Sequence, residues 1–198
     1  MTGELVLIRH GATEWSAAGR HTSVTDLPLT PDGERQARAL APVLAGYRFV
    51  AVFCSPRQRA RQTAVLAGLP VTSVEEDLAE WRYGEYEGIT TAQIRAQRPA
   101  WVLWRDGCPG GESPDEVGAR LDRVLARAEA AARDGDVAVV AHGHSLRVAG
   151  ARWIGLAARY GAGLMLDTAT LSVLGHEHAE RAIRRWNCSV PQQPPPAP

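Results

Sequence analysis

The sequence predicts an α/β protein, a three-layer α/β/α sandwich with a mostly parallel central sheet. Short apolar runs rich in β-formers have the length expected for strands that are buried on both faces. They alternate with longer segments of helical periodicity, and no internal repeat is visible. Alternating strands and helices are typical of parallel sheets that are covered by helices on both faces.

The expected elements follow in chain order. Strands are expected at Leu5–Ile8, Phe49–Phe53 and Val137–Ala141, with two later ones at 169–174 and 182–186. A first helix is expected to begin with Thr30 as N-cap and Pro31 at N1, and to end at Gly46. A second begins with a capping box, Ser113 to Glu116, and should end near Gly135. Further helices are expected at 58–67, 90–97 and 145–154.

Length and composition favour one domain. The 198 residues, 45% of them hydrophobic, suffice for one substantial core, and we expect the domain to cover residues 1–189. The last stretch, V-P-Q-Q-P-P-P-A-P at 190–198, is too rich in proline for a packed helix or strand. We expect a disordered tail there, with a ligand for a proline-recognition domain as the alternative.

Charge and cysteine content exclude several classes of protein. The 22 basic and 22 acidic residues balance, which argues against a nucleic acid or an anionic membrane as partner. All basic residues are arginine, which suits carboxylates and phosphates, although GC-rich coding produces the same bias. Cys54, Cys108 and Cys188 predict neither a disulfide framework nor a zinc site. The N-terminus has no signal sequence or membrane span, so we expect a cytoplasmic protein.

Polar groups follow three predicted strands. Arg9 and His10 come directly after the first, Ser55 after the second and His142 after the third. In a parallel sheet these strand ends lie along one edge, where ligands of open α/β folds bind. The groups therefore converge although the sequence separates them, and gathered guanidinium and imidazole groups predict a site for an anion.

A series of motifs accompanies these strand ends. They are Arg9-His10-Gly11 with Thr13-Glu14-Trp15, Leu29-Thr30 with Gly33 and Gln36-Ala37, Ser55-Pro56 with Arg59-Ala60 and Gln62-Thr63-Ala64, Glu80 with Tyr83-Gly84 and Glu87-Gly88, Gly110-Gly111-Glu112-Ser113, and Ala141 to Arg147. Together, from about residue 5 to 147, they resemble the histidine phosphatase superfamily, also called phosphoglycerate mutase-like. The resemblance implies a phosphoglycerate mutase-like fold and a histidine phosphatase domain over 1–189.

The resemblance also implies a mechanism. His10 would be the nucleophile that carries the phosphoryl group, and attack requires a neutral imidazole. Arg9 and Arg59 would lower the pKa of His10 and clamp the phosphoryl oxygens. His142 would donate to the same oxygens, and Glu80 would protonate the leaving oxygen and then activate water. The scheme requires no metal and no cofactor.

Substrate-binding residues are expected near these five. The candidates are Arg9, Arg59, Ser16, Thr22, Ser23, Trp81, Tyr83, Trp104, Gly143 and His144. Two departures from the family bear on them. Many members have asparagine at the position of Ser16, and a hydroxyl has a shorter reach. Ser23 stands where a glycine is frequent, so the backbone there is less permissive. Trp101 and Trp104 are expected to roof the pocket.

Plainer interpretations stand beside these roles. An isolated histidine after a strand is usually structural, Arg59 alone resembles a solvated helix residue, and Glu80 lies in an acidic stretch that is typical of an exposed loop. The histidine pairs at 142–144 and 176–178 resemble metal ligands, but two imidazoles make an incomplete site. We expect the second pair in an exposed turn.

Hydrolysis is favoured over isomerisation. Cofactor-dependent mutases of the family carry a longer insertion, with lysine and paired arginines, between the acid and the second histidine; this chain has no lysine and a short span from Glu80 to His142. Small bacterial acid-phosphatase-type members look most similar. We therefore predict a phosphomonoesterase of a small soluble phosphate ester. The alternatives are a phosphoglycerate mutase and a catalytically silent phosphate-binding module. The physiological substrate and the choice between monomer and homodimer stay open.

Overall fold

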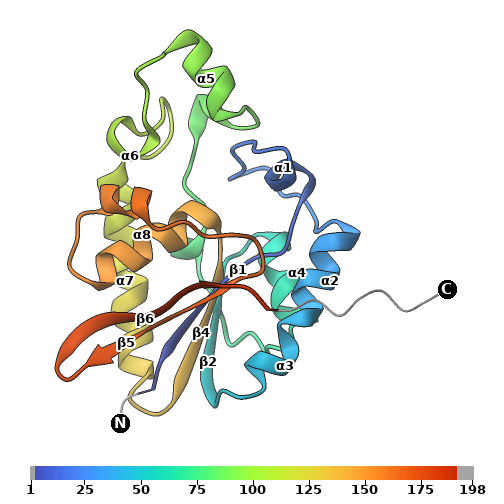
Figure 1. The fold of residues 1–198 in the computed structure, drawn as a ribbon, viewed down its shortest axis with the longest axis vertical. Coiled ribbons are helices and arrows are strands. Elements are labelled where there is room, and N and C mark those ends of the chain that lie inside the picture. Colours follow the sequence, from blue (N-terminus) through green and yellow to red (C-terminus); the bar gives the residue numbers. More distant parts are fainter. Residues whose placement is uncertain (1–2, 191–198) are drawn as a thin grey trace.

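A computed structural model describes residues 3–190 as a six-stranded sheet between two layers of helices (Figure 1). The strands are β1 (Leu5–Arg9), β2 (Phe49–Cys54), β3 (Ser73–Val74), β4 (Asp136–Ala141), β5 (Leu171–Glu177) and β6 (Glu180–Cys188). Their order in the sheet is β3-β2-β4-β1-β5-β6. The first four are mutually parallel, and β5 runs antiparallel to both its neighbours. The predicted fold class is confirmed.

Five of the helices cover the two faces of this sheet. The helices of the described residues are α1 (Glu14–Ala17), α2 (Pro31–Ala39), α3 (Ala41–Leu44), α4 (Gln58–Leu66), α5 (Thr91–Gln97), α6 (Leu103–Asp106), α7 (Pro114–Ala131) and α8 (Gly143–Trp153), with 3-10 turns η1 (Glu76–Leu78), η2 (Gly84–Tyr86) and η3 (Ala158–Gly163). The pair α7 and α8 lies on one side of the sheet, and α2, α3 and α4 lie on the other (Figure 1).

Alternation along β1 explains why its sequence is continuously apolar. Leu5 and Leu7 pack into the core below α7 and α8, whereas Val6 and Ile8 pack into the core below α2 and α4. Each of the four side chains is at most 2% exposed. A strand that is buried on both faces has no polar side, and this is the pattern that the sequence showed.

Two predicted helix ends are wrong. The helix expected to run from Thr30 to Gly46 is divided into α2 and α3, because Pro42 has no N–H and its ring clashes with the carbonyl four residues earlier. Helix α7 ends at Ala131 instead of near Gly135. The N–H groups of Arg133 and Asp134 bond carbonyls three residues back, which tightens the chain into a final turn. The very short β3, α1 and α6 were not predicted.

The sheet register brings the predicted polar strand ends together. Arg9 pairs with Ala141 across β1 and β4. Directly after these strands the N–H of His10 donates to the carbonyl of Ala141 (3.0 Å), and the N–H of Ser55 donates to the carbonyl of Val140 (2.9 Å). The ends of β2, β4 and β1 are therefore level with one another. The segments with α1, α5 and α6 lie above this edge, at the top of Figure 1.

Two predictions concern the limits of the chain. Apart from Val190, the expected proline-rich tail at 190–198 lies outside the described residues, and its disorder stays a prediction. Within residues 3–190, the structure contains no helix that is both long enough and apolar enough to span a membrane.

Candidate active site

A cavity of about 180 Å³ opens at the carboxyl ends of β1 and β4. Eight of the residues predicted for the site line it, and they are Arg9, His10, Ser16, Thr22, Glu80, Tyr83, Gly143 and His144. The other five, Arg59, His142, Ser23, Trp81 and Trp104, are not part of its wall. The cavity is also lined by residues that the prediction missed, among them His21, Arg20 and Arg147.

His10 lies at the end of β1 and is only 5% exposed. Its Nδ1 lies 2.7 Å from the carbonyl oxygen of Gly11, so Nδ1 carries the proton and donates it to that oxygen. The lone pair of the neutral ring is then on Nε2. Burial, followed by the positive charges of Arg59 and Arg9, lowers the pKa of His10 well below 6.5. The ring is therefore held in its neutral form.

Arg9 presents its guanidinium to the cavity. One Nη1–H donates to the carbonyl of Leu166, and the buried Nε has no hydrogen-bond partner among the described residues. The guanidinium lies against the first turn of α8, where a Cβ built on Gly143 would be 3.2 Å from Cζ of Arg9. A side chain at position 143 would therefore displace the guanidinium by a few tenths of an ångström. Burial lowers the pKa of Arg9, and the Glu80 carboxylate opposes this effect.

His142 lies beside His10 but uses both its ring nitrogens inside the protein. The two ring centroids are 5.1 Å apart at an interplanar angle of 63°. Arg59 donates its Nε–H to Nδ1 of His142 (3.1 Å), and an arginine can only donate, so the proton of His142 is on Nε2. That nitrogen lies 2.6 Å from Oγ of Ser55. Burial and then Arg59 hold the pKa of His142 well below 6.5.

Arg59 lies in the first turn of α4, is only 1% exposed, and joins several segments by hydrogen bonds. Its Nη1 donates to the carbonyl of Thr25 (3.2 Å), and its Nη2 donates to the carbonyls of Thr22 (3.1 Å) and Ser23 (3.4 Å). With the bond to His142, its donors hold the 22–25 loop against the end of β4. Arg59 thus lies behind the cavity wall, although the sequence predicted it as a phosphate clamp.

Glu80 connects the loop before η2 to the N-terminus of α8. Its Oε1 accepts from the N–H groups of Trp81 and Ser145, both at 2.8 Å, and its Oε2 accepts from the N–H of His144 at 3.0 Å. The N-cap residue of α8 makes no side-chain cap, so Glu80 supplies the acceptors for the first free N–H groups of the helix. The carboxylate, 7% exposed as a residue, faces the cavity in a fixed orientation.

One wall of the cavity is made of aromatic and imidazole rings. The hydroxyl of Tyr83 lies 2.6 Å from Nδ1 of His144, and the ring of His21 lies 4.6 Å from that of Tyr83. Burial, and then the Glu80 charge, raises the pKa of Tyr83 well above 10. Burial, and then Arg147, lowers the pKa of His144 well below 6.5. This wall is uncharged near neutral pH.

The three predicted hydroxyl ligands direct their hydrogens elsewhere. Oγ of Ser16 donates to the carbonyl of Thr13 (3.0 Å) and accepts from the N–H of the same residue (2.8 Å), which completes the capping box of α1. The Thr22 hydroxyl donates to the carbonyl of Arg20 (3.0 Å), and the Ser23 hydroxyl donates to the carbonyl of Glu80 (3.2 Å). None of the three hydrogens is directed at the cavity.

The tryptophans support the site from behind. Trp81 is fully buried, and its ring packs edge-on against Trp104 at 5.6 Å. The guanidinium of Arg147 lies over the Trp104 ring at 4.5 Å. Trp101 is also buried, and its Nε1 donates to the carbonyl of Gly107. The expected apolar roof is therefore a layer of packed rings outside the cavity wall.

Other histidines lie far from this cavity. His176 is half-buried in β5, and only His178 is in an exposed turn. Within residues 3–190, no group of three or more His, Cys, Asp and Glu side chains is arranged to hold a metal ion. Independence from metals stays a prediction.

Comparison with known proteins decides the family. Residues 5–189 match the profile of the Histidine phosphatase superfamily (branch 1). The chain belongs to the histidine phosphatase superfamily. A solved structure of an open reading frame product from Mycobacterium tuberculosis superposes on this histidine phosphatase with a TM-score of 0.93 at 41% identity, covering 96% of this chain and 99% of the other. The predicted family is confirmed.

Relatives of known activity agree with a phosphatase. An acid phosphatase of Mycobacterium tuberculosis is 43% identical over 181 residues, 90% of this chain and 89% of the relative. A sedoheptulose 1,7-bisphosphatase of Saccharomyces cerevisiae is 40% identical over 187 residues, 79% of this chain and 69% of the relative. Phosphoglycerate mutases also match, at lower identity. This histidine phosphatase is a phosphomonoesterase, as the sequence predicted.

Several cavity residues were missed by the sequence reasoning. Arg147 belongs to the last motif, and Arg20 and His21 directly precede Thr22, which was predicted. Their positions beside predicted residues were a usable signal. Thr13 and Thr91 line the cavity as well. Thr13 belongs to the first motif and is the N-cap of α1, whereas no sequence feature set Thr91 apart.

Proposed function

We propose that this phosphatase transfers the phosphoryl group of a small phosphate ester to Nε2 of His10 and then to water. The observation that carries the proposal is the state of His10: a buried, neutral ring on the cavity wall, with Nδ1–H bound to the carbonyl of Gly11. Such a ring has its lone pair on the other nitrogen and is ready to attack without first losing a proton.

Two displacements complete the reaction. In the first, the Nε2 lone pair of His10 forms a bond to phosphorus, the ester P–O bond breaks, and the leaving oxygen keeps the electron pair and takes a proton from Glu80. In the second, water attacks phosphorus and gives a proton back to Glu80, while the P–N bond breaks and its electron pair returns to Nε2. The sum is ester plus water to alcohol plus phosphate.

Hydrogen bonding selects one oxygen of Glu80 for the proton. Oε1 accepts from two N–H groups, whereas Oε2 accepts from one. A carboxylate oxygen has two lone pairs, so Oε2 keeps one that can hold the transferred proton. The backbone bonds fix the direction of that lone pair before substrate binds, which is how a general acid gains efficiency.

Arg9 supplies a positive charge and hydrogen-bond donors for the phosphoryl oxygens. Its Nε is buried without a partner among the described residues, and a buried unpaired donor is costly until a ligand accepts from it. Arg20 and Arg147 add two more guanidiniums to the cavity wall. These cations match the negative charge that a phosphate ester brings.

His142 and Arg59 receive a supporting role in this proposal. Donation from His142 to a phosphoryl oxygen would need a proton on Nδ1, the nitrogen that accepts from Arg59. In the observed arrangement the two residues instead pack behind His10, outside the cavity wall. The positive charge of Arg59 helps to keep His10 neutral. The catalytic residues that contact the substrate are then Arg9, His10 and Glu80.

The size of the cavity supports a small substrate. A volume of about 180 Å³ accommodates a phosphoryl group and a short organic part. In line with the sequence predictions, the proposal includes a cytoplasmic enzyme without metal, cofactor, nucleic acid or membrane partner. It is compatible with a monomer or a homodimer.

Trapping the intermediate tests the proposal. Wild-type protein is mixed with a radiolabelled phosphate ester and quenched rapidly, and the protein is expected to carry label that is stable in alkali and lost in acid. The His10→Ala variant should carry none, whereas a His178→Ala control, altered in an exposed turn, should label like wild type. Label that persists in His10→Ala overturns the assignment. Isomerisation of phosphoglycerate without release of phosphate would instead support the mutase alternative.

A further inference from the structure

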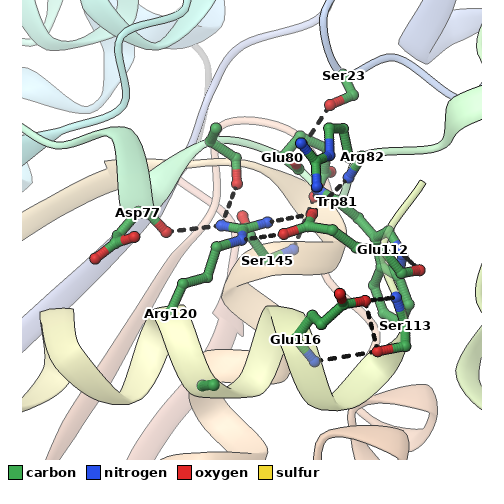
Figure 2. Close-up of polar contacts among 12 residues, drawn as sticks. Ser23, Asp77, Glu80, Trp81, Arg82, Glu112, Ser113, Glu116, Arg120 and Ser145 are labelled. Atoms are coloured by element: carbon green, nitrogen blue, oxygen red, sulfur yellow. Dashed lines mark hydrogen bonds and ion pairs between the residues drawn. The ribbon is translucent and has the colours of Figure 1, made fainter. Parts of the chain in front are cut away.

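The Gly110–Ser113 motif contributes no side chain to the substrate cavity, yet Glu112 forms a buried ion pair with Arg120 of α7 (Figure 2). Nε of Arg120 donates to Oε1 of Glu112 at 2.8 Å, and Nη2 donates to Oε2 at 3.1 Å. Each of the two side chains is 10% exposed. A buried ion pair costs desolvation energy and is weak evidence for a purely stabilising role, so the further contacts of this pair bear on its function.

The remaining N–H groups of Arg120 indicate that function. Nη1 donates to the carbonyls of Asp77 and Ala79, both at 2.7 Å. On the other side, Oε2 of Glu112 accepts from the N–H of Arg82 at 2.8 Å. The ion pair therefore holds the backbone immediately before and shortly after Glu80, as Figure 2 shows.

The backbone of Glu112 completes this clamp. Its N–H donates to the carbonyl of Arg82 (2.8 Å), and its carbonyl accepts from Nε1 of Trp81 (2.9 Å). Residues 77–82 have no strand partner that could fix them, because β3 ends at Val74. Side-chain and backbone groups of Glu112 and Arg120 supply the partners that a sheet would otherwise give.

We propose that Glu112 and Arg120 are positioning residues. They hold the backbone of Glu80 in the position from which its carboxyl group reaches the leaving oxygen. The inference rests on the proposed role of Glu80 as the proton donor. Neither residue lines the cavity that binds the phosphoryl group, so their contribution to proton donation is made through the backbone that carries Glu80. The N-terminus of α8 fixes the carboxylate end of Glu80, and the ion pair fixes its backbone.

A defect in proton donation depends on the leaving group. Departure of 4-nitrophenolate needs little help from an acid, whereas departure of an alkoxide needs a proton. A displaced Glu80 should therefore slow hydrolysis of an alkyl phosphate much more than that of 4-nitrophenyl phosphate. The ratio of the two kcat/KM values does not depend on how much of the protein is folded, so a loss of stability cannot imitate the effect.

The test compares Arg120→Gln, Glu112→Gln and Glu80→Gln with wild type on 4-nitrophenyl phosphate and glycerol phosphate. In both positioning variants we expect the ratio of kcat/KM for glycerol phosphate to that for 4-nitrophenyl phosphate to fall about tenfold or more, mainly through kcat. Inhibition by inorganic phosphate should change little, because Arg9 and His10 are untouched. Arg120→Lys, which keeps the charge, should recover part of the ratio.

Arg123→Gln is the matched control. Arg123 lies one turn further along α7 and binds the carboxylate of the same Asp77, but at the surface. Its loss should leave the ratio within about twofold of wild type. The positioning proposal is overturned by an unchanged ratio in Arg120→Gln and Glu112→Gln when Glu80→Gln lowers it. An unchanged ratio in Glu80→Gln overturns the role of Glu80 itself, and the positioning proposal with it.

Discussion

The polar segments at the carboxyl ends of β1 and β2 lie at the same edge of the sheet and each contain arginine, yet they use their polar groups differently. At the end of β1, Arg9 has a buried Nε without a partner among the described residues, and His10, directly after the strand, has an unprotonated Nε2. After β2, Ser55 bonds to His142, and Arg59 bonds to His142 and to three backbone carbonyls.

This difference separates the groups that meet substrate from the groups that shape the site. A donor that is already bound inside the protein gains little from a phosphoryl oxygen, whereas an unbound buried donor gains a full hydrogen bond. The two segments are nonetheless joined, because Oγ1 of Thr63 accepts from the N–H of Gly11 (3.0 Å) and donates to the carbonyl of Arg59 (2.7 Å). The second segment thus serves as the rigid support of the first.

The largest expected effect comes from exchanging the two arginines for glutamine. Arg9→Gln should lower kcat/KM about a hundredfold to a thousandfold, because it removes a donor to the phosphoryl oxygens. Arg59→Gln should lower the free energy of unfolding by about 2 kcal/mol or more, because buried carbonyls and His142 lose their donor. Steady-state kinetics and urea unfolding measure the two effects.

The reverse pattern would contradict the comparison. If Arg59→Gln lost activity without a loss of stability, and Arg9→Gln lost stability with little effect on kcat/KM, then the segment after β2 would be the one that binds the phosphoryl group. Arg61→Gln serves as the control, because Arg61 is an exposed arginine of the same helix α4.

The fold could be predicted from the sequence because its signals are local and repeated. The apolar run Leu5–Ile8 and the capping box at Ser113 each define an element without reference to the rest of the chain. The division at Leu40 was missed because the helical periodicity continues through Pro42. Elements as short as β3 carry too few residues for any periodicity.

The membership of the site was partly predictable, but the direction of each side chain was not. The motifs located Arg9, His10, Arg59, Glu80 and His142 near one another, and the family resemblance gave them their expected roles. Whether Arg59 faces the cavity depends on the carbonyls of residues 22–25, which come near it only after folding. The orientation of His21 depends in the same way on the carbonyl of Ile89, which its Nδ1 contacts only after folding.

The next effect concerns acid pH and the buried imidazoles that follow β1 and β4. Burial lowers the pKa of His10, His142 and His144 well below 6.5 in the folded protein. As the pH falls below 6.5, the unfolded chain takes up protons that the folded protein does not. The stability is therefore full above 6.5 and is lost as the pH falls toward the folded pKa values.

Two measurements check this expectation. Urea unfolding at pH 7.5 and 5 should show a lower free energy of unfolding at the acid value. An NMR titration of the ring nitrogens should find His10 less protonated at pH 5 than an ordinary imidazole, which is roughly 97% protonated there. A His10 resonance that titrates near 6.5 would show that this ring is not kept neutral by its surroundings, and that readiness for attack needs another source.

A smaller effect is expected from the glycine that accommodates Arg9. In Gly143→Ala the new Cβ lies 3.2 Å from Cζ of Arg9, so the guanidinium must shift by a few tenths of an ångström. We expect kcat/KM to fall about fivefold to tenfold, because small displacements of a phosphate donor reduce transition-state binding. Gly163→Ala is the control, since nothing lies within 4 Å of a Cβ there. Equal kinetics for the two variants would mean that Arg9 adapts freely.

The smallest kinetic effect should come from Ser16, and comparing it with Ser55 sharpens the contrast between the two segments. Ser16→Ala removes a hydroxyl that already bonds Thr13 twice, so we expect the KM and the inhibition by inorganic phosphate to stay within about twofold of wild type. Ser55→Ala should lower the free energy of unfolding by about 1–3 kcal/mol, because it leaves the buried Nε2–H of His142 unpaired. Weaker phosphate inhibition in Ser16→Ala would show that this hydroxyl leaves Thr13 to bind the phosphoryl group. The segment after β1 would then contribute a third ligand.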